Sequence, residues 1–201
     1  MNQQIILHLS QDPILKSLTE KIAFPQHGEP GGVYFDLLGS IISQQLSTKV
    51  AQVIENRFLD LFDDRLPHPE RILAIEHERL RSVGLSNQKA SYMRNIAEFF
   101  QRENIENKDW HDMDDEEIIR YLTQIKGVGK WTVEMMLMFT LKRPDVLPLD
   151  DYGIQTAIVK LYELTETGKA LKNRMVEIAE NWKPYRSYAC YYLWRFKDGR
   201  N

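Results

Sequence analysis

Apolar residues recur every three or four positions along most of the chain, which is the spacing that one face of an α-helix requires. No stretch shows the strict alternation of apolar and polar residues that is typical of a half-buried strand. The stretches with helical spacing are 35–62, 72–80, 90–100, 118–125, 131–141, 154–164 and 171–182. The pattern predicts an all-α fold of seven to ten helices.

The helical stretches are separated by short runs that contain glycine or proline, and no long Gly/Ser linker or internal repeat is present. The loosest stretch is expected at Gln26–Gly32. A length of 201 residues suits one domain or two small lobes with a real hydrophobic core.

Composition is that of an ordinary globular chain, with 43% apolar and 27% charged residues, which argues against a disordered or fibrous protein. The longest uncharged apolar run, Met135–Leu141, is too short for a membrane helix. The first nine residues lack the basic start and the cleavage site of a secretory signal, so we expect a cytoplasmic protein. A single cysteine, Cys190, excludes an internal disulfide and is expected to be a buried thiol.

The net charge of −3 is not that of a protein that binds nucleic acid with its whole surface, so any such contact must be local. Residues 98–117 carry nine acids and two bases, which we interpret as a solvated face. Residues 183–200 carry five bases and one acid.

The most informative segment runs from Leu122 to Tyr152. Asp114 and Glu117 have the spacing of a capping box, and the helix that they begin is predicted to end at Gly127. A second helix is predicted to begin at about Lys130, so backbone amides at its N-terminus could bind an anion such as a phosphate, with Lys126 and Lys130 beside it. On these residues alone, an ordinary turn closed by glycine explains the pattern equally well.

The run Ile125-Lys126-Gly127-Val128-Gly129-Lys130, followed 22 residues after Gly129 by Asp151, resembles the helix-hairpin-helix, loop and aspartate of the helix-hairpin-helix DNA glycosylase superfamily. The chain is most similar to the 3-methyladenine DNA glycosylase II branch. Three further blocks carry the resemblance: Ile41-Ile42-Ser43-Gln44-Gln45-Leu46-Ser47, Val83-Gly84-Leu85-Ser86 with Lys89-Ala90, and Trp182-Lys183-Pro184-Tyr185-Arg186-Ser187-Tyr188-Ala189 leading to Trp194.

The resemblance implies one glycosylase domain over residues 1–201, with two helical lobes and an active-site cleft between them, in a short form without the extra N-terminal lobe of some relatives. It also implies a monomeric enzyme that flips alkylated purines out of duplex DNA and hydrolyses their N-glycosidic bond. Gln44, Gln45 and Leu46 lie where the family inserts a wedge into the duplex.

Asp151 matches the catalytic carboxylate of the family, which would stabilise positive charge on the sugar as the base departs. Asp150 is expected to cap the following helix instead. Trp131, Tyr152 and Trp194 match positions where the family places rings that attract a cationic base. Four further aromatic residues could line or support this pocket: Tyr185, Tyr188, Tyr191 and Tyr192.

Relatives that also cleave the DNA backbone carry a lysine two residues after the second hairpin glycine, where this chain has Trp131, so a monofunctional enzyme is expected. No iron–sulfur cysteine cluster follows the core, and the five histidines lack close metal-ligand spacing. The resemblance implies no cofactor for the chemistry, but a monovalent cation bound by the backbone carbonyls of Thr123, Ile125 and Val128.

Two alternatives remain open at this point. One is a non-enzymatic helix-hairpin-helix protein that grips DNA phosphates, although such a protein needs neither Asp151 nor the clustered aromatic rings. The other is a glycosylase for a different lesion.

Overall fold

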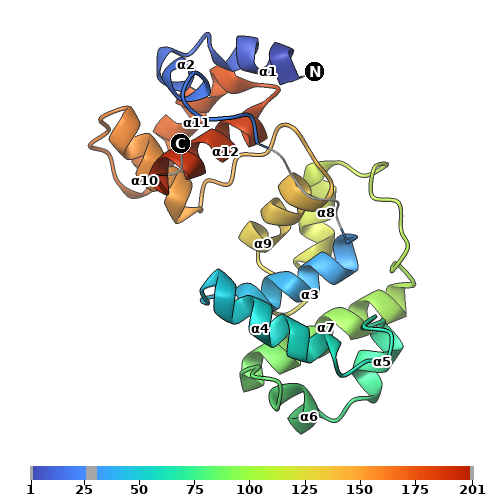
Figure 1. Cartoon of the computed structure of the whole chain (residues 1–201). Coiled ribbons are helices and arrows are strands. Elements are labelled where there is room, and N and C mark those ends of the chain that lie inside the picture. Colours follow the sequence, from blue (N-terminus) through green and yellow to red (C-terminus); the bar gives the residue numbers. More distant parts are fainter. Residues whose placement is uncertain (1, 26–30, 200–201) are drawn as a thin grey trace. The chain divides into compact units, whose positions relative to one another are not determined.

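The computed structural model describes residues 2–25 and 31–199, and their regular structure is entirely helical, which confirms the predicted all-α fold (Figure 1). This described part of the chain holds twelve α-helices, more than the seven to ten expected. Residues 26–30 of the stretch expected to be loosest lie outside the described residues. None of the described helices is long and apolar enough to cross a membrane.

The chain divides into two compact units. The second unit, Glu29–Met136, is continuous in sequence. Its helices are α3 (Val33–Ser43), α4 (Thr48–Leu59), α5 (Pro69–Ala74), α6 (His77–Arg81), α7 (Asn87–Glu103), α8 (Asp115–Leu122) and α9 (Lys130–Met135). The longest, α7, packs against α3, α5 and α6, so it forms the centre of this unit.

Local sequence signals explain where two of these helices begin. Ser86 caps α7 by accepting a hydrogen bond of 3.1 Å from the amide of Lys89, and the helix closes at Asn104 in the left-handed conformation. The expected capping box of α8 is present, with Asp114 and Glu117 each bonded to the other's amide. The helix ends at Leu122, however, and a short turn leads from there to Gly127.

Other helical stretches are divided further than their periodicity indicated. Residues 72–80 fall in two helices, α5 and α6, because Ile75 has an extended backbone. Residues 131–141 begin as α9 and continue as a π-helical turn, η1 (Met136–Thr140).

The first unit joins the two ends of the chain, Met1–Gly28 and Leu137–Asn201. Its α-helices are α1 (Asn2–Leu9), α2 (Pro13–Thr19), α10 (Tyr152–Leu161), α11 (Gly168–Ala179) and α12 (Arg186–Lys197), with a 3-10 turn, η2 (Glu180–Trp182), after α11. Helix α12 packs against both α10 and α2, so the N-terminal segment is part of the core around the C-terminal helices.

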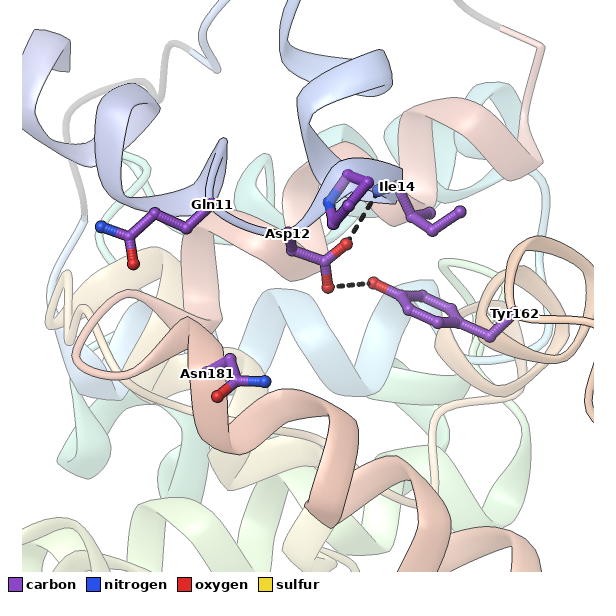
Figure 2. A pocket seen from close by; sticks show the side chains of 6 residues that line it. Gln11, Asp12, Ile14, Tyr162 and Asn181 are labelled. Atoms are coloured by element: carbon purple, nitrogen blue, oxygen red, sulfur yellow. Dashed lines mark hydrogen bonds between the residues drawn. The ribbon is translucent and has the colours of Figure 1, made fainter.

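Asp12 ties the N-terminal segment to the C-terminal half of this unit. One carboxylate oxygen caps α2 by accepting from the amides of Ile14, at 2.8 Å, and Leu15, at 3.3 Å. The other accepts from the Tyr162 hydroxyl at 2.6 Å and from the Trp182 indole at 3.0 Å. Figure 2 shows Asp12 between Ile14 and Tyr162 at the edge of a surface pocket. Burial, and next the bond to Asp12, raise the pKa of Tyr162, so its hydroxyl stays a neutral donor.

We therefore expect Asp12→Ala to lower the free energy of unfolding by about 2–4 kcal/mol, since it removes a helix cap and leaves two largely buried donors without their acceptor. Urea unfolding followed by circular dichroism measures the change. Asp114→Ala, which removes a cap on the exposed surface, is the matched control and should cost about 1 kcal/mol. Equal losses in the two variants would contradict the structural role of Asp12.

Candidate active site

Asp151 is a buried carboxylate at the N-terminus of α10. One of its oxygens, Oδ1, accepts from the amide of Ile154 at 2.8 Å and from the indole Nε1 of Trp194 at 2.8 Å. The residue is 8% exposed, so these donors replace the water that a charged carboxylate needs. The predicted catalytic Asp151 and the predicted base-binding Trp194 are thus in direct contact.

The expected role of Asp150 is wrong, because Asp151 itself caps α10. The Asp150 side chain is exposed and forms an ion pair with Lys172 of α11. The two acids therefore differ sharply in environment: Asp150 is solvated, while Asp151 is held inside the fold.

The loop that leads into Asp151 is anchored on α12. The Arg186 guanidinium binds the Asp145 carboxylate in a two-pronged contact, with Nε–Oδ1 and Nη2–Oδ2 distances of 2.8 and 2.9 Å. The Ser187 hydroxyl donates to the Arg143 carbonyl at 2.7 Å and accepts from the Val146 amide at 2.9 Å. These contacts fix the backbone that carries Asp151 relative to the helix that carries Trp194.

A group of aromatic rings surrounds Trp194. Phe139 of η1 stacks on its indole, with ring centroids 5.8 Å apart and planes 27° apart, and Tyr191 lies 6.1 Å from it. Burial raises the pKa of Tyr191, so its hydroxyl is neutral and donates to the Met138 carbonyl at 2.9 Å. The group presents uncharged rings beside an anionic carboxylate, which is the environment that attracts a flat cation.

The structure adds Phe139 to the predicted set of rings, and the predicted tyrosines differ in how far their side chains are exposed. Phe139 is 39% exposed although its neighbours on both sides are buried. Tyr152, the first residue of α10, is 77% exposed. Of the other tyrosines, Tyr192 is fully buried, while Tyr185 and Tyr188 are half-buried.

The predicted hairpin residues and Trp131 belong to the other unit. Gly127 has a φ of 108°, and a Cβ added there would lie 2.2 Å from the Tyr92 ring of α7, so only glycine fits. Gly129 precedes α9, is exposed, and has open space around its Cα. The Lys126 carbonyl accepts a hydrogen bond of 2.9 Å from the side-chain amide of Asn95, on α7. Trp131 is 41% exposed on the first turn of α9.

The predicted wedge residues form the turn between α3 and α4. Gln45 has a φ of 59°, which brings Gln45 and Leu46 to the surface. The Lys89 ammonium of α7 donates to the carbonyls of Ile42 and Gln44, both at 2.8 Å. Burial lowers the pKa of Lys89.

Helix α7 therefore supports both predicted DNA-contacting loops. Lys89 holds the turn of Gln44, and Tyr92 and Asn95, three and six residues further along, contact the hairpin. Sequence reasoning noted Lys89 only as part of a block and did not single out Tyr92 or Asn95. Their spacing on one helical face was visible, but the partners are more than thirty residues away in the chain.

The expected cation ligands lie at the end of α8 and in the turn that follows it. Thr123 is the C-terminal cap of α8, and the Val128 amide donates to the Ile125 carbonyl at 3.0 Å in the turn that follows. The described residues contain no group of three or more His, Cys, Asp and Glu that could hold a metal, and Cys190 is a buried thiol as expected.

A helical fold with a hairpin between two helices, a loop and a buried aspartate that caps the next helix is typical of one class of DNA repair protein. The sequence pattern of that class, described as HhH-GPD superfamily base excision DNA repair protein, matches residues 38–184. The chain belongs to this family.

Two relatives and a solved structure carry the comparison further. A Bacillus subtilis protein, YfjP, is 35% identical over 169 residues, which cover 81% of this chain and 58% of that protein. DNA-3-methyladenine glycosylase 1 of Schizosaccharomyces pombe is 37% identical over 164 residues, which cover 81% of this chain and 71% of that enzyme. The structure of the Schizosaccharomyces pombe 3-methyladenine DNA glycosylase Mag1 in complex with abasic DNA has a TM-score of 0.83, 33% identity and 97% coverage of both chains.

The contacts of Lys89 predict that the wedge turn depends on it. Lys89→Met keeps the aliphatic stem but removes both bonds to the carbonyls of Ile42 and Gln44, so the amides of residues 44–47 should exchange with solvent at least about tenfold faster. Hydrogen exchange measured by mass spectrometry tests this. Lys49→Met, at an exposed lysine of α4, is the matched control and should leave exchange unchanged.

Proposed function

We propose that this protein is a monofunctional DNA glycosylase that removes alkylated purines from duplex DNA and so begins base excision repair. The observation that carries the proposal is the buried Asp151 carboxylate, bonded to Trp194 beside stacked aromatic rings. Membership of the base excision repair family and the similarity to enzymes named for 3-methyladenine support it. Because its substrate is DNA, we propose that the protein acts inside the cell. We also propose that it acts as a monomer.

DNA contact is assigned to the surface loops of the second unit. The exposed backbone around Gly129, with Lys126 and Lys130, offers a compact contact for a phosphate, and the turn of Gln44, Gln45 and Leu46 offers two amides and an apolar plug for the space that a flipped base leaves. Phosphate contacts carry no base information, so this part of binding should not depend on sequence.

The chemistry is assigned to Asp151. The bond between C1′ and the base nitrogen breaks with its electron pair leaving on the base, and positive charge builds on the sugar. The carboxylate stabilises that charge, and water then bonds to C1′ as its proton passes to Asp151. A purine alkylated on a ring nitrogen, as in 3-methyladenine, is already cationic in DNA, so it leaves without a second carboxylic acid of the glycosidase type.

Two features support hydrolysis by water over attack by an enzyme amine. Trp131 occupies the position that the backbone-cleaving relatives give to lysine. The neighbouring Lys130 ammonium lies 3.7 Å from the Glu134 carboxylate, in an ion pair along α9. We also propose that a monovalent cation can bind the carbonyls of Thr123, Ile125 and Val128, where it would supply positive charge next to the phosphate contact.

Base release from duplex DNA treated with a methylating agent tests the proposed function directly. The wild-type protein should release methylated purines, identified by chromatography. Asp151→Asn should lose on the order of 10² to 10⁴ in rate, because it removes the charge but keeps an oxygen that can cap α10. Asp150→Asn, at the exposed neighbour, is the control and should retain full activity.

Binding of duplex DNA without base release by the wild-type protein would favour the non-enzymatic alternative, and release of a different lesion would favour the other glycosylase. An inactive Asp150→Asn variant together with an active Asp151→Asn variant would assign the catalytic role to Asp150.

Product DNA should carry intact abasic sites. A Schiff base with an enzyme amine would be trapped covalently by borohydride, so no trapped complex is expected with this protein on a damaged duplex. A trapped complex that disappears in Lys130→Ala would contradict the monofunctional assignment.

A further inference from the structure

Gly153, the second residue of α10, lies against both members of the Asp151–Trp194 contact. A Cβ added to Gly153 would stand 2.9 Å from Cδ1 and 3.1 Å from Nε1 of the Trp194 indole, and 3.1 Å from Oδ1 of Asp151. The carboxylate oxygen and the indole nitrogen within this short range are the acceptor and the donor of the 2.8 Å hydrogen bond.

The backbone conformation at residue 153 does not require a glycine. Gly153 has no positive φ, and α10 continues through it, so alanine could adopt the same conformation. Alanine is the better helix former, and a change from glycine to alanine at a compatible position reduces the entropy of the unfolded chain. The space that the missing side chain leaves is occupied by the edge of the Trp194 indole.

We propose that Gly153 and Trp194 together form a positioning device for Asp151. The absence of a side chain at residue 153 lets the indole lie across the first turn of α10, and the indole N–H then holds the orientation of the carboxylate. Phe139 stacks on the indole and keeps it in the plane that this bond requires. The proposal rests on the proposed function, because it assigns these residues to the step that Asp151 performs.

The role differs from that of a base-binding ring. A ring that only attracts a cationic base acts through its face and does not need an indole N–H. A positioning donor acts through its N–H, and a misplacement of the carboxylate by about 1 Å can cost on the order of 10²-fold in rate. Trp194→Phe keeps an aromatic face beside Phe139 and removes the donor, so it separates the two roles.

The test measures single-turnover base release from methylated duplex DNA for Gly153→Ala, Trp194→Phe and the double variant. Gly153→Ala and Trp194→Phe should each lower the rate at saturating enzyme by about 10- to 100-fold, while affinity for undamaged duplex stays within about twofold. The double variant should be within about threefold of Trp194→Phe, because the donor that a methyl group at position 153 would displace is already gone.

Gly39→Ala is the matched control, since Gly39 is also helical and a Cβ there would meet only an ordinary contact, Glu55 Oε1 at 3.5 Å. It should keep the wild-type rate. Urea unfolding should find Gly153→Ala folded, which separates misplacement of Asp151 from loss of the fold. If Gly153→Ala does not fold, Trp194→Phe decides alone, as it leaves α10 unchanged.

Three results would overturn the proposal: a wild-type rate in folded Gly153→Ala, a wild-type rate in Trp194→Phe, or losses that multiply in full in the double variant. Failure of the proposed function is a different outcome, in which the wild-type protein itself releases no base.

Discussion

The structure around the proposed active centre depends on keeping one carboxylate charged in a place with little water. Asp151 is 8% exposed, and burial of an unpartnered carboxylate would cost several kcal/mol. Its donors come from two helices, the backbone of α10 and the indole of α12. The packing of α10 on α12, and the contacts of Arg186 and Ser187 with the loop before Asp151, hold the two helices that supply these donors together.

In the second unit, α7 has to hold two surface turns in place. Two surface turns with left-handed residues, at Gln45 and Gly127, have little regular structure to hold them. A lysine, an aromatic ring and an asparagine on one face of α7 replace that structure with direct contacts. The loops proposed to meet DNA are therefore shaped by the central helix of this unit, which need not touch DNA itself.

Periodicity and spacing predicted the part of this architecture that depends on local sequence. The helical class, the capping box of Asp114 and Glu117, and the start of α9 at Lys130 are confirmed because neighbouring residues decide them. The cap of α10 was assigned to the wrong acid, since Asp150 and Asp151 are both good caps by type, and tertiary contacts distinguish them: Asp151 binds Trp194 and Asp150 pairs with Lys172. Phe139 was counted only within the helix predicted over 131–141, and not among the base-binding rings, because a π-helical turn departs from the 3.6-residue period on which that prediction rests.

The glycines of the hairpin and of α10 show that residue type alone does not reveal why a glycine is present. At Gly127 both a φ of 108° and the Tyr92 ring exclude a side chain, whereas Gly129 has neither constraint. Gly153 is the informative case, because its backbone would accept alanine and the helix would gain from it. The atoms that a side chain at Gly153 would meet belong to the buried Asp151 carboxylate and to its partner Trp194. The glycine therefore lowers the local stability of the helix but preserves the geometry of the carboxylate. Such conflicts between local preference and structure concentrate at functional sites.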